Sequence, residues 1–187
     1  MTTGTDATLA VIDALEMLGV PYMLVGSLSS NVYGIPRSTH DADFVIECAA
    51  EILPRLATHL GPAYRLDPQM TFETATLTRR HVLAVAGIPF TIEFFHLSDD
   101  PHDQERFRRR RRVQTMGREV FLPTAEDVII TKLRWMLNAR RTKDSDDARD
   151  VIAVQGENID WPYVYSWCDR HGTRALLDEI RSSIPPL

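Results

Sequence analysis

Cysteine is scarce in this sequence: Cys48 and Cys168 are the only two in 187 residues. They lie far apart, and neither has partners at the spacing of a metal site, so the sequence encodes neither a disulfide framework nor a zinc knuckle. We expect both to be buried thiols. The six histidines also show no ligand spacing, and the sequence has no glycine-rich P-loop and no Ser-His-Asp motif.

Long apolar runs are missing too. No run approaches the roughly 20 residues that a bilayer-spanning helix needs. The N-terminus MTTGTDATLA lacks the basic region and apolar stretch of a signal peptide. These absences predict a cytoplasmic protein without a membrane partner.

Lysine is nearly absent, since only Lys132 and Lys143 among the 21 basic residues are lysine. This bias is typical of a GC-rich bacterial genome, so arginine clusters carry less functional weight than usual. The net charge of −5 argues against nucleic-acid binding by the whole surface. The run Arg108–Arg112 follows several acidic residues, which favours a solvated helix; an RNA or nucleotide contact is the alternative.

Hydrophobic residues make up 44% of the chain, enough for the core of one ordinary domain. The residue patterns predict an α+β fold, with an α/β core over residues 1–122 and a helical subdomain over 123–187. In the core we expect helices at 7–18, 28–33 and 49–60, strands at 22–25, 41–47 and 118–122, and a β region at 74–97. In the subdomain we expect helices at 128–138, 144–155, after Asp160-Trp161-Pro162, and at 173–182.

Several residues mark the expected helix ends. Asp6 is a candidate N-cap for the first helix and Gly19 its stop. Thr124 and Asp127 form a possible capping box before residue 128.

The first candidate for chemistry is the point where an apolar strand ends in Gly26-Ser27 and turns into a helix. Backbone N–H groups and a hydroxyl beside a positive helix end suit a phosphate group. Gly26 would let the backbone approach such a ligand closely. Taken alone, the same pair could simply be a helix N-cap without a ligand.

Three acids form the second candidate. Asp41 and Asp43 are two residues apart on a predicted strand, so their carboxylates leave the same face and repel each other unless a cation lies between them. Glu93 is surrounded by Ile92, Phe94 and Phe95, where a carboxylate is costly without a partner or a function. Two Mg²⁺ ions bridged by such carboxylates can clamp the attacking and leaving oxygens of a nucleotidyl transfer.

With Gly26-Ser27, Asp41-x-Asp43 and Glu93 in this order, the sequence resembles the nucleotidyltransferase fold superfamily. The segment Gly34 to Asp43 reads Gly-x-Pro-Arg-x-Thr-x-Asp-x-Asp, which is the extended form of its signature. The stretches 125–133 and 141–147 resemble the bacterial branch that contains abortive-infection toxins and aminoglycoside nucleotidyltransferases. The superfamily core is a mixed β-sheet flanked by helices.

The resemblance implies roles for individual residues. Asp41, Asp43 and Glu93 would be catalytic and would hold Mg²⁺ or Mn²⁺. Gly26, Ser27, Arg37 and Lys132 would bind the nucleotide. The reaction would move an NMP group from an NTP to a hydroxyl of an RNA, a protein or a small molecule. A toxin role with a cognate antitoxin is part of the same implication.

Other interpretations of these residues stay open. Asp41 and Asp43 could face solvent on an edge strand, paired with Arg37 or His40, and Glu93 could pair with a neighbouring arginine. Lys132 could be the polar edge of an amphipathic helix, and Asp144 and Asp147 could cap a helix. Two other function classes compete with the enzyme: a non-catalytic nucleotide-binding or regulatory protein that keeps the fold, and a small nucleic-acid-binding protein.

Overall fold

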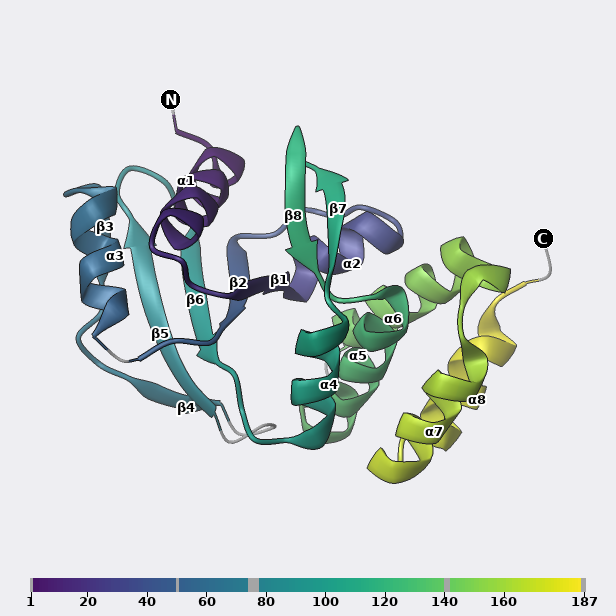
Figure 1. Cartoon of the computed structure of the whole chain (residues 1–187). Helices are drawn as coiled ribbons and strands as arrows, with labels where there is room; N and C mark the ends of the chain where they lie inside the picture. Colours follow the sequence, from purple (N-terminus) through teal and green to yellow (C-terminus); the bar gives the residue numbers. More distant parts are fainter. Residues whose placement is uncertain (1, 50, 74–77, 140–141, 186–187) are drawn as a thin grey trace.

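The chain folds into a mixed β-sheet with flanking helices, followed by a bundle of helices (Figure 1). The computed structural model describes residues 2–49, 51–73, 78–139 and 142–185. The first part contains α1 (Gly4–Met17), β1 (Tyr22–Val25), α2 (Gly26–Tyr33), β2 (Asp41–Ile46), α3 (Ile52–Leu60), β3 (Tyr64–Leu66), β4 (Thr71–Glu73), β5 (Thr78–Val85), β6 (Thr91–His96), α4 (Pro101–Arg109), β7 (Arg111–Thr115) and β8 (Arg118–Leu122). The second part contains α5 (Ala125–Ala139), α6 (Thr142–Gln155), the 3₁₀ turn Gly156–Asn158, α7 (Trp161–His171) and α8 (Arg174–Ser183).

The central sheet has the strand order β1-β2-β6-β5-β3, with β4 also paired to β5. β2 and β6 are parallel, whereas the pairs β1–β2, β5–β6, β3–β5 and β4–β5 are antiparallel. The α+β prediction with a mixed sheet is therefore confirmed. β7 and β8 form a separate hairpin. The parallel pair matters most for the site, because it aligns the residues of β2 with those of β6.

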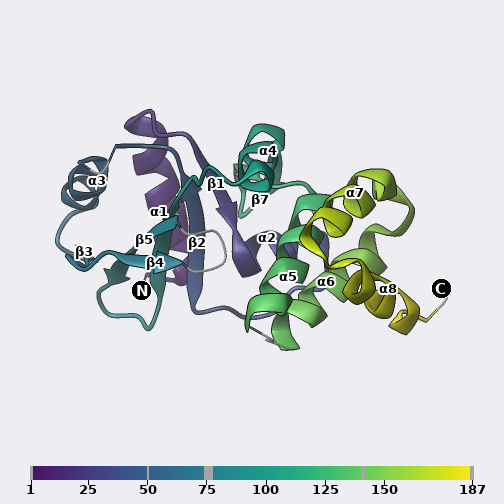
Figure 2. The same cartoon turned by 90° about the horizontal axis from the view of Figure 1, so that it is seen from below.

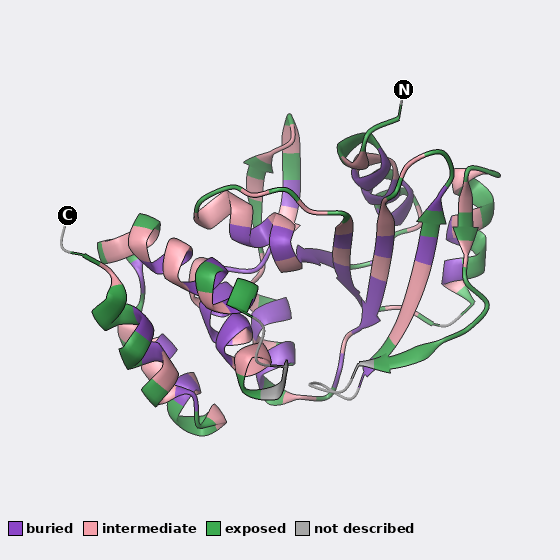
Figure 3. Cartoon of the chain, turned by 180° about the vertical axis from the view of Figure 1, so that it is seen from behind, coloured by how far each residue is buried: buried purple, intermediate pink, exposed green. Residues whose placement is uncertain are grey.

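Apolar side chains cover both faces of the sheet. On one face the side chains of α1 and α3 pack with Phe44, Ile92 and Phe94 in the largest core cluster. On the other face Met23, Val45 and Phe95 pack against Phe107 of α4. Figure 3 shows the buried residues concentrated along the central strands. Because side chains pack on both faces, the central strands β2 and β6 are fixed in the interior of the molecule.

The helices after β8 have a core of their own. Buried residues of α5 and α6, such as Ile129, Leu133 and Val151, pack with Val164 of α7 and Leu177 of α8. Figure 2 shows α7 and α8 on the side of the molecule far from α3. α5 and α6 lie between them and the sheet, and both contact α2. These two helices therefore supply the second wall of any site at the start of α2.

Most of the expected elements are present, with different ends. The N-cap of α1 is Thr3, and Asp6 completes the capping box by accepting from the Thr3 N–H at 2.8 Å. The capping pair Thr124 and Asp127 is confirmed, with 2.9 Å between Thr124 Oγ1 and Asp127 Oδ2. The short strands β3, β4 and β7 have no counterpart in the prediction. The part of the predicted β region at 74–77 lies outside the described residues.

The interpretation of Arg108–Arg112 as one solvated helix is wrong. α4 ends at Arg109, and Arg111 and Arg112 already belong to β7. The guanidinium of Arg109 stacks 3.9 Å from the ring centroid of Tyr163, and that of Arg110 stacks 4.0 Å from Phe107. Aromatic neighbours hold these two side chains at half-buried positions. Contacts within the protein therefore explain two arginines of the run, and no nucleic acid is needed to explain them.

The cysteines differ in burial: Cys168 is buried, as expected, whereas Cys48 is only half-buried. In the described part of the chain, no helix has the length and apolar character to cross a membrane.

Candidate active site

The pairing of β2 with β6 brings the three predicted acids to one wall of a cavity. Asp43 is the register partner of Glu93, and Asp41 lies two residues before Asp43 on the same face of β2. The cavity has a volume of about 320 Å³, and all three acids line it together with Gly26 and Ser27. The remaining lining residues are Phe72, Arg80, Phe95, Lys132, Trp135, Lys143 and Asp144. An edge-strand position for Asp41 and Asp43 is wrong, because β2 lies between β1 and β6.

Gly26 connects β1 to α2 at the edge of this cavity. Val25, the residue before it, is the register partner of Asp43. Gly26 has a φ of +64°, and a Cβ at this position would lie 1.9 Å from Asp43 Oδ2. Only glycine fits a conformation this close to a carboxylate. No side chain among the described residues caps the start of α2, which leaves its first N–H groups available to a ligand.

The carboxylates on β2 are poised for a cation. Burial in the cavity wall, with the nearby charges of Asp41 and Glu93, raises the pKa of Asp43 to about 7. Thr39 donates a hydrogen bond of 2.5 Å to Asp41 Oδ1, which fixes the second acid. An all-oxygen donor set of this kind fits Mg²⁺ or Mn²⁺. Asp41, Asp43 and Glu93 are thus the residues that would hold the metal.

Glu93 has a partner that competes with a metal. Arg80 of β5 forms an ion pair with Glu93 through Nη2 and Oε1, and both residues line the cavity. The side chain of Glu93 is 17% exposed and that of Arg80 is 34% exposed. The structure thus contains the arginine pair that was the alternative to metal binding by Glu93.

Lys132 of α5 reaches the cavity from the helical side and is held by two acids of α6. Its Nζ lies 3.1 Å from Asp144 Oδ1 and 2.7 Å from Asp147 Oδ2. The side chain of Lys132 is only 7% exposed, so it is not the polar edge of an amphipathic helix. Asp144 and Asp147 are buried partners of this lysine. Asp144 does lie in the first turn of α6, whereas neither acid is the N-cap, because the helix already begins at Thr142.

Arg37 lies behind the cavity and is not among its lining residues. Its Nε donates to Asp147 Oδ1 at 2.7 Å, and its Nη2 donates to Ser27 Oγ at 2.9 Å. Burial alone would raise the pKa of Asp147, but the hydrogen bonds from Arg37 and Lys132 outweigh it and hold that pKa below its ordinary value. Because Ser27 Oγ accepts from Arg37, its own hydrogen can be donated to a phosphate oxygen. Arg37 therefore positions Ser27 from behind.

A second acidic group lies near the start of α4. Ligand atoms of Asp100, His102 and Asp103 lie within 4.8 Å of one another, a grouping that could hold a metal ion. In the part of the chain that the structure describes, Asp41, Asp43 and Glu93 do not meet this criterion. However, Arg134 donates to both oxygens of Asp100 at 2.9 Å, and Arg106 pairs with Asp103 at 2.8 Å. Both of these carboxylates have cationic partners, whereas of the β2–β6 acids it is Glu93 that forms an ion pair with a described residue, so the β2–β6 group fits a metal better.

Arg80, Phe72 and Trp135 are cavity residues that the sequence interpretation missed. Arg80 could have been found, because a hairpin turning at residues 87–88 pairs Val82 with Glu93 and places Arg80 on the same face. Phe72 is 65% exposed on the short strand β4, and the three residues of that strand give no period-two signal. Trp135 follows Lys132 by three residues on α5, a spacing that indicates one helix face.

Comparisons with known proteins concern the fold of the chain. No protein-family model and no curated protein matches the chain. Among solved structures, the antibiotic-resistance factor ANT(2'')-Ia aligns over 96% of this chain and 96% of its own, with 13% identity and a TM-score of 0.64. A nucleotidyltransferase from H. pylori aligns over 96% and 78%, with 17% identity and a TM-score of 0.55. The lincosamide antibiotic adenylyltransferase LnuA aligns over 82% and 98%, with 11% identity and a TM-score of 0.53. The chain thus has the nucleotidyltransferase fold.

Proposed function

We propose that this protein is a Mg²⁺-dependent nucleotidyltransferase that moves an NMP group from an NTP to a hydroxyl acceptor. The observation that carries the proposal is the register of β2 and β6, which gathers Asp41, Asp43 and Glu93 beside Gly26 and Ser27 in one cavity. Solved structures with the same fold include one of ANT(2'')-Ia with adenylyl-2''-tobramycin, which is a nucleotidylated product.

The residues of the chain divide the work of this reaction. The Ser27 hydroxyl and the first N–H groups of α2 bind phosphate oxygens of the NTP. A bound Mg²⁺ would polarise the α-phosphate and neutralise charge on the leaving group. The acceptor oxygen forms a bond to the α-phosphorus. The bond between that phosphorus and the oxygen bridging the α- and β-phosphates breaks, and pyrophosphate leaves. A carboxylate oxygen of Glu93 takes the proton of the acceptor hydroxyl.

We propose a hydroxyl-bearing small molecule as the acceptor to test first. ANT(2'')-Ia and LnuA, which share the fold, are an antibiotic-resistance factor and a lincosamide adenylyltransferase. RNA and protein hydroxyls are the other acceptors of this proposal, and a toxin role with an antitoxin partner would require one of them. The same labelled-nucleotide assay separates the three classes.

A non-catalytic nucleotide-binding or regulatory protein is the second candidate. The observation that favours it is the ion pair between Arg80 and Glu93, which leaves the third acid already neutralised. Such a protein would bind an NTP and show no transfer. The two candidates therefore differ in turnover and not in binding.

The deciding experiment incubates the protein with each α-labelled NTP, Mg²⁺ and a panel of aminoglycosides, lincosamides, RNA and protein. We expect metal-dependent label transfer with release of pyrophosphate. Asp41→Asn and Asp43→Asn should each lose transfer by at least about 10²-fold while keeping the fold. Asp146→Asn, the same change at a 54% exposed side chain on α6, is the matched control and should retain full turnover. Metal-dependent NTP binding without transfer would favour the second candidate, and no binding would contradict both.

A further inference from the structure

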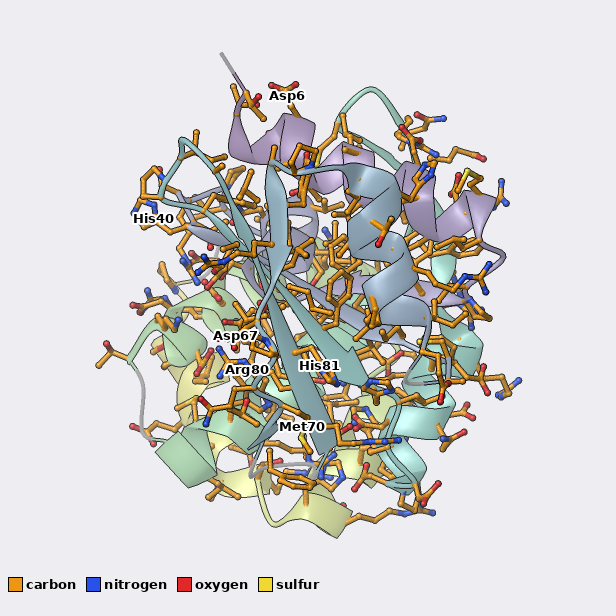
Figure 4. All side chains as sticks on the ribbon, turned by 90° about the vertical axis from the view of Figure 1, so that its left-hand side faces the viewer. Asp6, His40, Asp67, Met70, Arg80 and His81 are labelled. Carbon is orange, nitrogen blue, oxygen red and sulfur yellow. The ribbon has the colours of Figure 1, made fainter. Side chains whose placement is uncertain are left out.

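Arg80 is a charged residue of the cavity wall that the proposed reaction does not use. It lies on β5, two residues before Val82, which is the register partner of Glu93. Side chains alternate along a strand, so Arg80 is on the cavity face, whereas Arg79 and His81 are on the opposite face. Figure 4 shows Arg80 and His81 on opposite sides of the strand.

The contacts of Arg80 leave much of its guanidinium without a partner. Nη2 pairs with Glu93 Oε1, while the Nε atom is buried and makes no hydrogen bond to any described residue. A guanidinium has five N–H donors in a fixed fork, and a buried donor without an acceptor is costly. The Nε donor therefore needs an acceptor that the described residues do not supply.

Arg80 also pairs with a carboxylate that the divalent cation of the proposed reaction would use. A carboxylate that neutralises an arginine is a weaker metal ligand, because the ligand must first lose its partner. Consistent with this, the ligand oxygens of Asp41, Asp43 and Glu93 do not all lie within 4.8 Å of one another among the described residues. The cation of Arg80 thus compensates Glu93 in the protein without metal.

We propose that Arg80 is an exchangeable counter-ion of Glu93, which yields the carboxylate to the divalent cation and turns its guanidinium to the phosphates of the NTP. The inference rests on the proposed function for the identity of the second ligand. Arg80 suits the exchange because its planar fork matches phosphate oxygens as well as carboxylates. Arg80 thus neutralises Glu93 when no metal is bound, and it contributes to NTP binding when the metal and the nucleotide are bound.

The test measures Mn²⁺ binding without nucleotide, through the loss of the free-Mn²⁺ electron paramagnetic resonance signal. Arg80→Gln should bind Mn²⁺ at least about threefold more tightly than the wild type, since a partly exposed ion pair no longer competes. Arg79→Gln removes the same charge from the other face of β5 and should stay near wild type. Arg80→Lys keeps the positive charge and should show little of the gain in Mn²⁺ affinity that Arg80→Gln shows. Thermal denaturation of each variant verifies folding.

A double-mutant cycle with Glu93→Gln separates exchange from a general charge effect. The gain from Arg80→Gln should disappear when Glu93 is already neutral, while a general field effect would persist. For the loaded state, Arg80→Gln should raise the KM for NTP by about threefold or more. Equal Mn²⁺ affinity of Arg80→Gln and wild type, absence of Mn²⁺ binding in every variant, or a gain that survives in Glu93→Gln would each overturn the proposal. A protein that shows the exchange but no transfer would refute the proposed function alone.

Discussion

Gly26→Ala is the substitution for which the structure gives the most definite expectation. The new Cβ would lie 1.9 Å from Asp43 Oδ2, whereas real Cβ contacts are essentially never under 3.0 Å. The carboxylate of Asp43 must therefore move by about 1 Å. Rotation of the Asp43 side chain can carry the oxygen away, whereas Asp43 Cβ, 3.1 Å from the new Cβ, stays in tight contact. The displaced acid is one of the proposed metal ligands.

Two separate magnitudes follow. A non-glycine residue in the left-handed region costs roughly 1–2 kcal/mol, which lowers the Tm of a chain this size by about 2–8 °C. Moving a catalytic group by about 1 Å costs about 10²-fold in rate. Gly26→Ala should thus be mildly destabilised and severely impaired in Mn²⁺ binding and transfer.

Gly19→Ala is the matched control for this prediction. Gly19 has a φ of +66°, close to that of Gly26, and no atom lies within 4 Å of a Cβ at that position. It should show the same loss of Tm and no loss of Mn²⁺ affinity or turnover. Thermal denaturation, Mn²⁺ titration and nucleotide transfer on the same preparations decide the matter. Wild-type metal affinity and turnover in Gly26→Ala would refute the placement of Asp43 at the catalytic metal.

Two further predictions concern stability. Asp147→Ala removes the shared partner of Lys132 and Arg37 and should lower the free energy of unfolding by about 3 kcal/mol. The control Asp146→Ala, on the exposed face of α6, should change it by less than about 1 kcal/mol. Equal chemical denaturation curves for the two variants would contradict the buried ion pairs. Burial lowers the pKa of His171 from 6.5 to about 4, beside His102, Arg134, Asp100 and Asp103. The unfolded chain then binds a proton that the folded chain excludes, so stability should fall as the pH drops from about 6.5 to about 4. His171→Gln should flatten that fall in a pH series of thermal midpoints, and an unchanged slope would contradict the assignment.

The acids of the candidate site could be predicted because their signals are local. The spacing of Asp41 and Asp43 places both on one strand face, and Glu93 is conspicuous in an aromatic strand. Their gathering in one cavity depends on the parallel pairing of β2 with β6, which the chain order alone does not reveal. The resemblance to a known fold supplied that step.

The contacts of Lys132 could not be predicted in the same way. Its spacing on α5 indicates a polar edge, and its true partners lie 12 and 15 positions later on α6. Which face of α5 meets α6 is decided by the packing of the helical core and not by the sequence near Lys132. The hairpin of β7 and β8 was missed for a different reason, because the strand Arg111–Thr115 has one apolar residue and its pairing depends on the turn at Met116-Gly117.

The contacts of Asp147 have a consequence for how related chains can differ. Its carboxylate forms ion pairs with two cations from different segments, Arg37 from the loop after α2 and Lys132 from α5. A neutral residue at 147 leaves Arg37 without its acid and leaves Lys132 with Asp144 alone, so the loss of Asp147 should favour the loss of Arg37 as well. Positions 37, 132 and 147 should therefore covary among homologues. A chimera that takes its helical part from another member of the fold would have to take residue 37 with it.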